Sequence, residues 1–166
     1  MKSKKLAVGA LIAALYAILT HLQNVILPGS ATWAIQMRMS EALCVLAFFT
    51  PAAIWGLGAG CFLFNILYAG ALPLDPIVGT LATVLAAGSM YAVRKLKVFG
   101  IPVLGMLMPA LFNAFLVGWE LWLFLETPFW LNALYVAIGE LLVLLVLGTA
   151  LYILLNRRFR RLIEGE

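Results

Sequence analysis

Long apolar stretches, separated by short polar segments, run along most of the chain. A helix that crosses a membrane needs about 20 apolar residues. Helix starts are marked by Thr50-Pro51, Asp75-Pro76 and Thr127-Pro128, since proline suits the first helical position and the residue before it can cap the helix. The pattern predicts six spans, at approximately residues 6–20, 38–49, 51–68, 75–93, 101–124 and 128–156. The second span is short for a full crossing, and Pro109 is expected to bend the fifth.

The composition fits a membrane protein and not a soluble one. Hydrophobic residues make up 65% of the 166 residues and charged residues 11%, whereas soluble domains are about 45–50% apolar and about 25% charged. A soluble enzyme, a nucleic-acid-binding protein and a disordered chain are therefore excluded. We expect one all-α integral membrane domain over residues 1–166. Cys44 and Cys61 lie in apolar runs and are interpreted as small core residues.

The basic residues indicate an orientation. Lysine and arginine collect on the cytoplasmic side of membrane proteins. With six spans, every cation except Arg38 falls on one side, together with both termini. These residues are Lys2, Lys4, Lys5, Arg94, Lys95, Lys97, Arg157, Arg158, Arg160 and Arg161. The sequence therefore predicts cytoplasmic N- and C-termini, with Arg38 on the outer side.

Glu120 and Glu140 lie well inside predicted spans, where ionisable groups are costly and suggest function. Glu140 is sixteen residues from Asn156, about 24 Å along a helix, and Glu120 is twenty residues from Gly100, about 30 Å. Since the hydrocarbon layer is about 30 Å thick, both fall in its outer part. This asymmetry favours a pocket open to the outside over a continuous ion path.

Helical spacing brings further polar residues to that level. Asn113 and Glu120 are seven residues apart and share one helix face. Asn132 lies near the outer end of the sixth span, and Asn65 near the outer end of the third. Structural alternatives stay open: Arg38 and Glu41 could form an ion pair, Asp75 could cap a helix, and the outer tryptophans could form an interfacial belt.

Small residues recur every four positions in the first and third predicted spans. Gly9, Ala13 and Ala17 form one such series, Ala10 and Ala14 a second, and Ala52, Gly56 and Gly60 a third. Such faces let helices approach closely in lipid. Internal packing explains the third span well, whereas for the first span docking to another membrane protein is an equal alternative.

Sequence signatures of catalysis are missing. The chain has no G-x-x-x-x-G-K-[ST] phosphate loop, no Cys/His metal cluster and no nucleophile elbow. We therefore expect no catalytic residues, metal or cofactor, and any ATP would be hydrolysed by another chain.

Two runs resemble a known family. Gln36–Ala53 reads QMRMSEALCVLAFFTPAA and Leu74–Thr83 reads LDPIVGTLAT. Both are similar to the QueT family, whose members are substrate-binding S components of bacterial energy-coupling-factor (ECF) transporters for queuosine precursors. The resemblance implies a six-helix S-component bundle in the plasma membrane. It also implies a partner assembly of one transmembrane coupling subunit and two ATPase subunits, docked on the face formed by Ala10, Ala13, Ala14 and Ala17.

The implied ligand is a 7-deazaguanine such as 7-aminomethyl-7-deazaguanine, or queuine. Its guanine-like edge offers N–H donors to one carboxylate, and an aminomethyl cation would suit a second; Glu41, Glu120 and Glu140 are the candidates. The ring would stack on an aromatic side chain such as Trp119 or Trp130. The predicted ligand-contacting residues are Gln36, Arg38, Glu41, Asn65, Asn113, Trp119, Glu120, Asn132 and Glu140.

Three alternatives remain at this stage. The chain could be an S component for a different vitamin or nucleobase. It could be a membrane interaction protein with no small ligand, in which case the outer polar residues are merely interfacial. It could also be an intramembrane enzyme that turns over substrate without partner subunits.

Overall fold

The computed structural model describes residues 2–30 and 37–164, and these residues are almost entirely helical. The elements, in chain order, are α1 (Lys2–Ile26), η1 (Met39–Phe48), α2 (Ala52–Leu67), α3 (Asp75–Val93), α4 (Val103–Met106), α5 (Met108–Leu125), α6 (Phe129–Val143), η2 (Leu144–Gly148) and α7 (Thr149–Glu164). Four helical segments are long and apolar enough to cross a membrane: Ser3–Ile26, Asp75–Val93, Val103–Leu125 and Phe129–Arg158. The expected all-α membrane architecture is confirmed at this level.

Prolines mark several helix boundaries. Pro51 directly precedes α2, Pro76 stands in the first turn of α3, and Pro128 directly precedes α6. Near Pro109 the chain is interrupted at Leu107, between the single turn of α4 and the long helix α5. An interruption here agrees with the expected bend, because proline provides no N–H for the preceding turn.

Helix α1 continues to Ile26, beyond the apolar stretch that ends at Thr20. The polar residues Thr20, Gln23 and Asn24 in its last turns are buried. The Thr20 hydroxyl donates to the Tyr16 carbonyl at 2.8 Å. The Gln23 side chain donates to the Met37 carbonyl at 2.6 Å and accepts from the Met39 N–H at 2.8 Å. These bonds replace hydration and let the helix extend past its apolar part.

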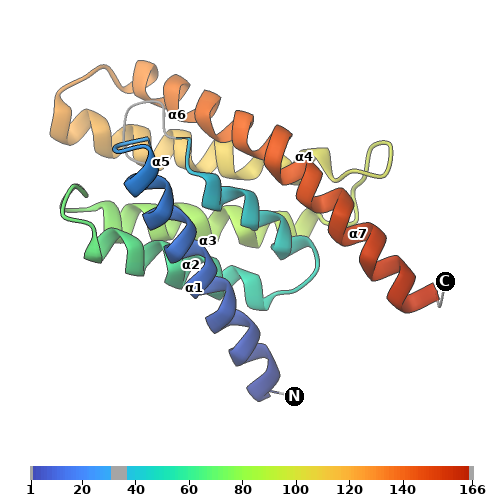
Figure 1. The fold of residues 1–166 in the computed structure, drawn as a ribbon. Coiled ribbons are helices and arrows are strands. Elements are labelled where there is room, and N and C mark those ends of the chain that lie inside the picture. The colour runs from blue at the N-terminus through green and yellow to red at the C-terminus, as the bar shows by residue number, and fades with distance from the viewer. Residues whose placement is uncertain (1, 31–36, 165–166) are drawn as a thin grey trace.

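The helical segments run back and forth between two ends of the bundle (Figure 1). Both termini, the turn at residues 49–51 and the loop at 94–102 lie at one end. The turns at 68–74 and 126–128 lie at the opposite end. The N-terminal residues Lys4 and Lys5 and the basic loop 94–97 therefore lie at the opposite end of the bundle from the turn at 126–128.

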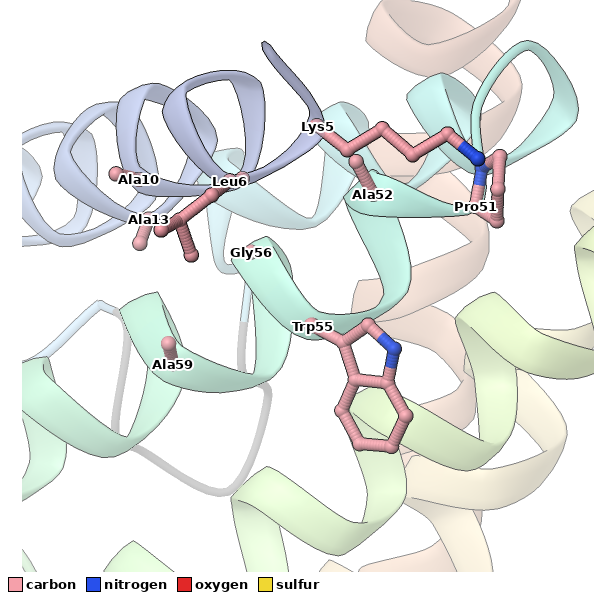
Figure 2. Close-up of a pocket in the computed structure, with 10 residues that line it drawn as sticks. Lys5, Leu6, Ala10, Ala13, Pro51, Ala52, Trp55, Gly56 and Ala59 are labelled. Atoms are coloured by element: carbon pink, nitrogen blue, oxygen red, sulfur yellow. The ribbon is translucent and has the colours of Figure 1, made fainter. Parts of the chain in front are cut away.

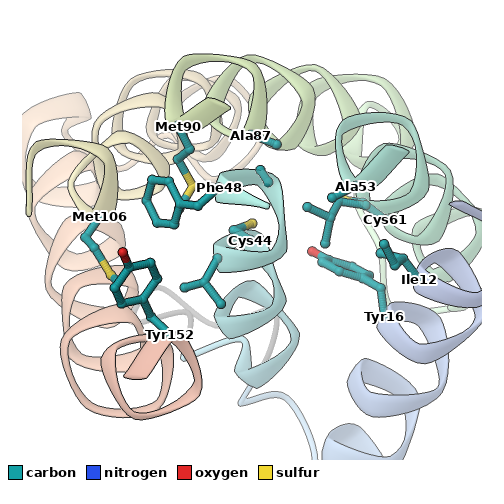
Figure 3. Packing of buried hydrophobic residues seen from close by; sticks show 13 residues of the cluster. Ile12, Tyr16, Cys44, Phe48, Ala53, Cys61, Ala87, Met90, Met106 and Tyr152 are labelled. Atoms are coloured by element: carbon teal, nitrogen blue, oxygen red, sulfur yellow. The ribbon is translucent and has the colours of Figure 1, made fainter. Parts of the chain in front are cut away.

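The short helix η1 lies at the centre of the bundle, and seven of its ten residues are buried. A 3₁₀ helix rises about 2.0 Å per residue instead of about 1.5 Å, so ten residues reach about 20 Å. The 3₁₀ form thus lengthens a segment that is short for its position. Around it pack Tyr16 of α1, Met90 of α3 and Tyr152 of α7 (Figure 3).

Both cysteines belong to this core. Cys44 of η1 and Cys61 of α2 are fully buried and carry free thiols. Their interpretation as small core residues is confirmed. Nearby, the ring of Phe48 meets Tyr152 edge-on, with ring centroids 5.7 Å apart.

Helices α1 and α2 touch through small residues. A Cβ added at Gly56 would lie 2.6 Å from the Gly9 carbonyl oxygen, and one added at Gly60 would lie 2.7 Å from the Ala13 carbonyl oxygen. Such contacts are closer than real Cβ atoms allow. The small faces of the first and third predicted spans therefore pack against each other, so Gly9 and Ala13 serve internal packing.

We predict that Gly60→Ala destabilises the protein. The new methyl group would push α1 away from α2, and overpacking of this kind costs about 1–3 kcal/mol. Gly88→Ala is the matched control, because a Cβ at Gly88 meets nothing within 4 Å and alanine favours a helix over glycine by about 0.5–1 kcal/mol. Thermal unfolding in detergent should show a lower midpoint for the first variant only. Equal midpoints for both variants would contradict the close contact.

Candidate functional site

Buried polar side chains collect in the part of the bundle away from the termini. They come from five helical segments and are each at most 8% exposed. The members are Arg38, Glu41, Asn65, Asp75, Asn113, Glu120 and Glu140. Polar groups buried in a membrane protein are expensive and are kept for pairing or for function. The partners of each residue decide which role applies.

Glu41 is fully engaged by its neighbours. Its Oε1 accepts a hydrogen bond from the Tyr16 hydroxyl, and its Oε2 accepts one from the Cys44 thiol at 3.1 Å. One residue earlier, the Ser40 and Thr20 hydroxyls are 2.6 Å apart. These contacts fasten the start of η1 to α1, so Glu41 has a clear structural role.

Arg38 points into the protein and is only 7% exposed. Its Nη1 lies 3.6 Å from the Cys61 Sγ, and its guanidinium is 5.8 Å from the centre of the Phe64 ring. Glu41 is among the groups with which it interacts electrostatically. Arg38, which the sequence predicts on the outer side, therefore supplies positive charge inside the cluster.

Glu140 of α6 is held at one oxygen only. The Asn113 amide of α5 donates to its Oε1 at 3.2 Å. Its Oε2 is buried and has no hydrogen-bond partner among the described residues. Glu41 and Arg38 are its charged neighbours. The Asn113 contact thus orients a carboxylate whose second oxygen is available.

Glu120 of α5 has neither oxygen paired. The residue is 0% exposed, and no described residue donates a hydrogen bond to its Oε1 or Oε2. Its strongest charged neighbour is Asp75, at the start of α3. The Asp75 Oδ2 accepts from the Leu72 N–H at 2.6 Å, which closes the turn before α3. Asp75 is therefore a structural residue that also interacts electrostatically with Glu120.

Asn65 of α2 lies beside the start of α3. Its amide nitrogen donates to the Asp75 carbonyl oxygen at 3.0 Å. Its Oδ1 is buried without a partner in the described part of the chain. Asn65 therefore ties α2 to α3 and leaves one acceptor inside the protein.

Other predicted contact residues lie elsewhere. Asn132 bonds within its own turn, accepting from the Thr127 hydroxyl at 3.0 Å and donating to the Thr127 carbonyl at 3.2 Å. Trp119 is 42% exposed and Trp130 73%. Trp119 shares the exposed face of α5 with Phe115 and Trp122, which is typical of an interfacial belt. The structure does not bring these side chains into the cluster, and Gln36 falls outside the described residues.

The alanine series of α1 divides into two parts. Ala13 is buried against α2, whereas Ala10 and Ala14 are exposed and Ala17 is partly exposed. Beside them runs a groove of about 540 Å³ between α1 and α2, lined by Lys5, Leu6, Trp55 and small residues including Ala10 and Ala13 (Figure 2). Of the four alanines predicted to form a docking face, only Ala10, Ala14 and Ala17 are therefore on the surface of α1.

Sequence reasoning missed Tyr16, which holds Glu41. A signal was present, because Tyr16, Thr20 and Gln23 follow one another at helical spacing and form a polar stripe on α1. All three are buried. A polar stripe on an otherwise apolar span predicts an inward face.

Comparison with known families agrees with this architecture. The family model of the QueT transporter matches residues 6–157, which is nearly the whole chain. The chain belongs to the QueT transporter family. No curated protein and no solved structure matches it. A QueT transporter is a multi-pass membrane protein that moves a solute, so its buried carboxylates are considered for binding and not for catalysis.

For this QueT-family transporter we predict that Tyr16→Phe lowers the stability. The change removes the donor to Glu41 and leaves a buried carboxylate oxygen unpaired, at a cost of about 1–3 kcal/mol. Tyr152→Phe is the control, because that hydroxyl makes only a 3.4 Å contact to the Gly100 carbonyl. Thermal unfolding in detergent should separate the two variants. A Tyr16→Phe midpoint equal to that of Tyr152→Phe would argue against the bond to Glu41.

Proposed function

We propose that the chain is the substrate-capturing S component of an ECF-type importer for a queuosine precursor. It binds a 7-deazaguanine, such as 7-aminomethyl-7-deazaguanine or queuine, from the outside. A separate module, made of a transmembrane coupling subunit and two ATPase subunits, energises delivery inward. The protein lies in the bacterial plasma membrane with both termini cytoplasmic.

The observation that carries this proposal is a set of three buried carboxylate oxygens that have no hydrogen-bond partner among the described residues. They are both oxygens of Glu120 and the Oε2 of Glu140. Leaving a buried acceptor unpaired costs about 1–3 kcal/mol, and a ligand with several N–H donors would remove that cost. The family membership supports a transported solute as this ligand.

The direction of capture is supported by charge. The basic loop at 94–97 lies at the same end of the bundle as the termini (Figure 1). Glu120 lies in the last two turns of α5, which leads to the turn at the other end. If the basic end is cytoplasmic, the unpaired carboxylates face the outer side, where a capture subunit meets its substrate.

The chemistry of the cluster suits a flat, donor-rich heterocycle. Glu140 is oriented by Asn113 and can accept from the neighbouring N–H groups of a guanine-like edge. Arg38 provides a nearby guanidinium for a ligand carbonyl oxygen. Gln36 is kept as a proposed contact next to Arg38 in the sequence. Asn132 and Trp119 support the site indirectly if at all, since one closes a turn and the other faces outward.

Docking of the energising module is proposed on the exposed part of α1. Ala10 and Ala14, with the partly exposed Ala17, form a small-residue strip that another helix can approach closely. Ala13 lines the adjoining groove with Gly56 of α2. Docking there leaves the carboxylate cluster undisturbed in the interior.

The first test of the function is calorimetric binding to the detergent-purified chain alone. We expect saturable binding of 7-aminomethyl-7-deazaguanine and a weaker Kd in Glu140→Gln, by about 1.5–3 kcal/mol or roughly ten- to a hundredfold. Glu126→Gln, on the exposed end of α5, is the control and should bind like the wild type.

The panel also contains guanine, thiamin and riboflavin. If only a vitamin binds, the proposed substrate is wrong and the proposed S-component role stands. Absence of binding by folded protein would favour the membrane interaction protein.

The second test concerns docking. We expect Ala10→Leu to reduce uptake severalfold in cells that also express the coupling and ATPase subunits, because a bulky side chain blocks close helix approach. Binding by the purified chain should stay unchanged. Ala150→Leu, on the exposed surface of α7, is the matched control. Uptake lowered equally by both substitutions would contradict docking at α1.

A further inference from the structure

The buried cluster contains two acidic centres at different depths along α5. Asn113 holds Glu140 at the inner one, and Glu120 forms the outer one together with Asp75. Asn113 and Glu120 are seven residues apart, so they share one face of α5 and lie about 10 Å apart along its axis. A two-ring heterocycle with a one-carbon arm has about the length needed to reach both centres.

The inner centre contains one cation and two carboxyl groups. Its two carboxyl groups, Glu140 and Glu41, have the buried guanidinium of Arg38 nearby. Glu41 already accepts from Tyr16 and Cys44, and Glu140 accepts from Asn113. The remaining Glu140 oxygen can accept from a neutral N–H donor, because Arg38 already offsets part of the negative charge at this centre.

The outer centre has a different charge pattern. Both Glu120 oxygens are unpaired among the described residues, and another carboxyl group, that of Asp75, interacts with Glu120 electrostatically. Arg38 is a weaker neighbour of Glu120 than Asp75 is. Two adjacent carboxylates shielded from water repel each other, and a positive group between them stabilises both.

A third acceptor lies beside this pair. The Asn65 amide is anchored on the Asp75 carbonyl oxygen, and the Asn65 Oδ1 is buried and unpaired within the described chain. Asp75 thus interacts electrostatically with Glu120 and bonds through its backbone to Asn65, so α5, α3 and α2 each bring an acceptor to the start of α3. A primary ammonium group carries three N–H donors and one positive charge, which matches this set of acceptors.

We propose that Glu120 and Asp75 bind a primary ammonium group of the substrate, while Glu140 binds neutral N–H donors of its ring. This assignment rests on the proposed function. It gives Glu120 and Glu140 different parts of the ligand to bind. It makes Glu120 a specificity residue that favours the aminomethyl form of the substrate over uncharged forms.

The experiment compares two ligands that differ in that group. 7-Aminomethyl-7-deazaguanine carries the ammonium, and 7-cyano-7-deazaguanine has the same rings without it. Calorimetry on the detergent-purified full chain gives both Kd values for the wild type, Glu120→Gln, Asp75→Asn, Glu140→Gln and the exposed control Glu126→Gln. Glutamine and asparagine keep the shape of the side chain and remove its charge.

We expect Glu120→Gln to weaken binding of the aminomethyl ligand by about ten- to a hundredfold and to change binding of the cyano ligand less than twofold. Asp75→Asn should shift the same ratio in the same direction, and Glu140→Gln should weaken both ligands. Retained binding of the cyano ligand shows that Glu120→Gln and Asp75→Asn are folded. If Glu120→Gln does not fold, Asp75→Asn and the wild-type ratio still decide the assignment.

Three results would overturn the assignment. Equal losses for both ligands in Glu120→Gln would place Glu120 at the ring, and unchanged binding would remove it from the site. A wild-type protein that binds the two ligands equally would exclude an ammonium subsite while leaving the proposed function intact. Binding of neither ligand by the wild type would overturn the proposed function itself.

Discussion

The hydrogen bond from Tyr16 to Glu41 ties the central helix η1 to α1, and the rest of the interior is arranged around it. Tyr16 reaches η1 at the level where α1 lies tightly on α2, at the glycine contact of Gly60. With its start fixed, η1 directs Arg38 inward. The guanidinium then lies near Glu41 and Glu140. Close backbone packing on one side of the bundle thus supports the charge arrangement in its centre.

Within this frame, the partners of the buried polar residues separate structure from function. Glu41 and Asn132 have partners on both side-chain polar atoms, and each joins two local segments. Glu120 has no partner among the described residues, and Glu140 is held at one oxygen. Membrane interiors strongly favour satisfied polar groups. An arrangement that satisfies some carboxylates and leaves others open is best explained by donors that arrive with a solute.

Much of this organisation could be predicted from residue order alone. Proline positions mark most helix starts, and counting along the helix places Glu120 near the end of α5 that leads to the turn at 126–128. Side-chain direction was harder, because lipid-facing and core-facing positions are both apolar in a membrane bundle. That is why Trp119 was expected in the site although it faces outward, and why Ala13 was grouped with the exposed alanines. The 3₁₀ form of η1 depends on tertiary packing and has no local signal.

Helix α1 links the two proposed activities. Its inward side carries Tyr16, which bonds to Glu41, and a different side carries Ala10 and Ala14. A change at the carboxylate cluster that moves η1 would act on α1 through Tyr16, Thr20 and Gln23, which all bond to η1 or the segment before it. A rigid helix transmits such a shift along its whole length, since its backbone bonds resist bending. The proposed substrate capture and the proposed docking therefore involve two different sides of one helix.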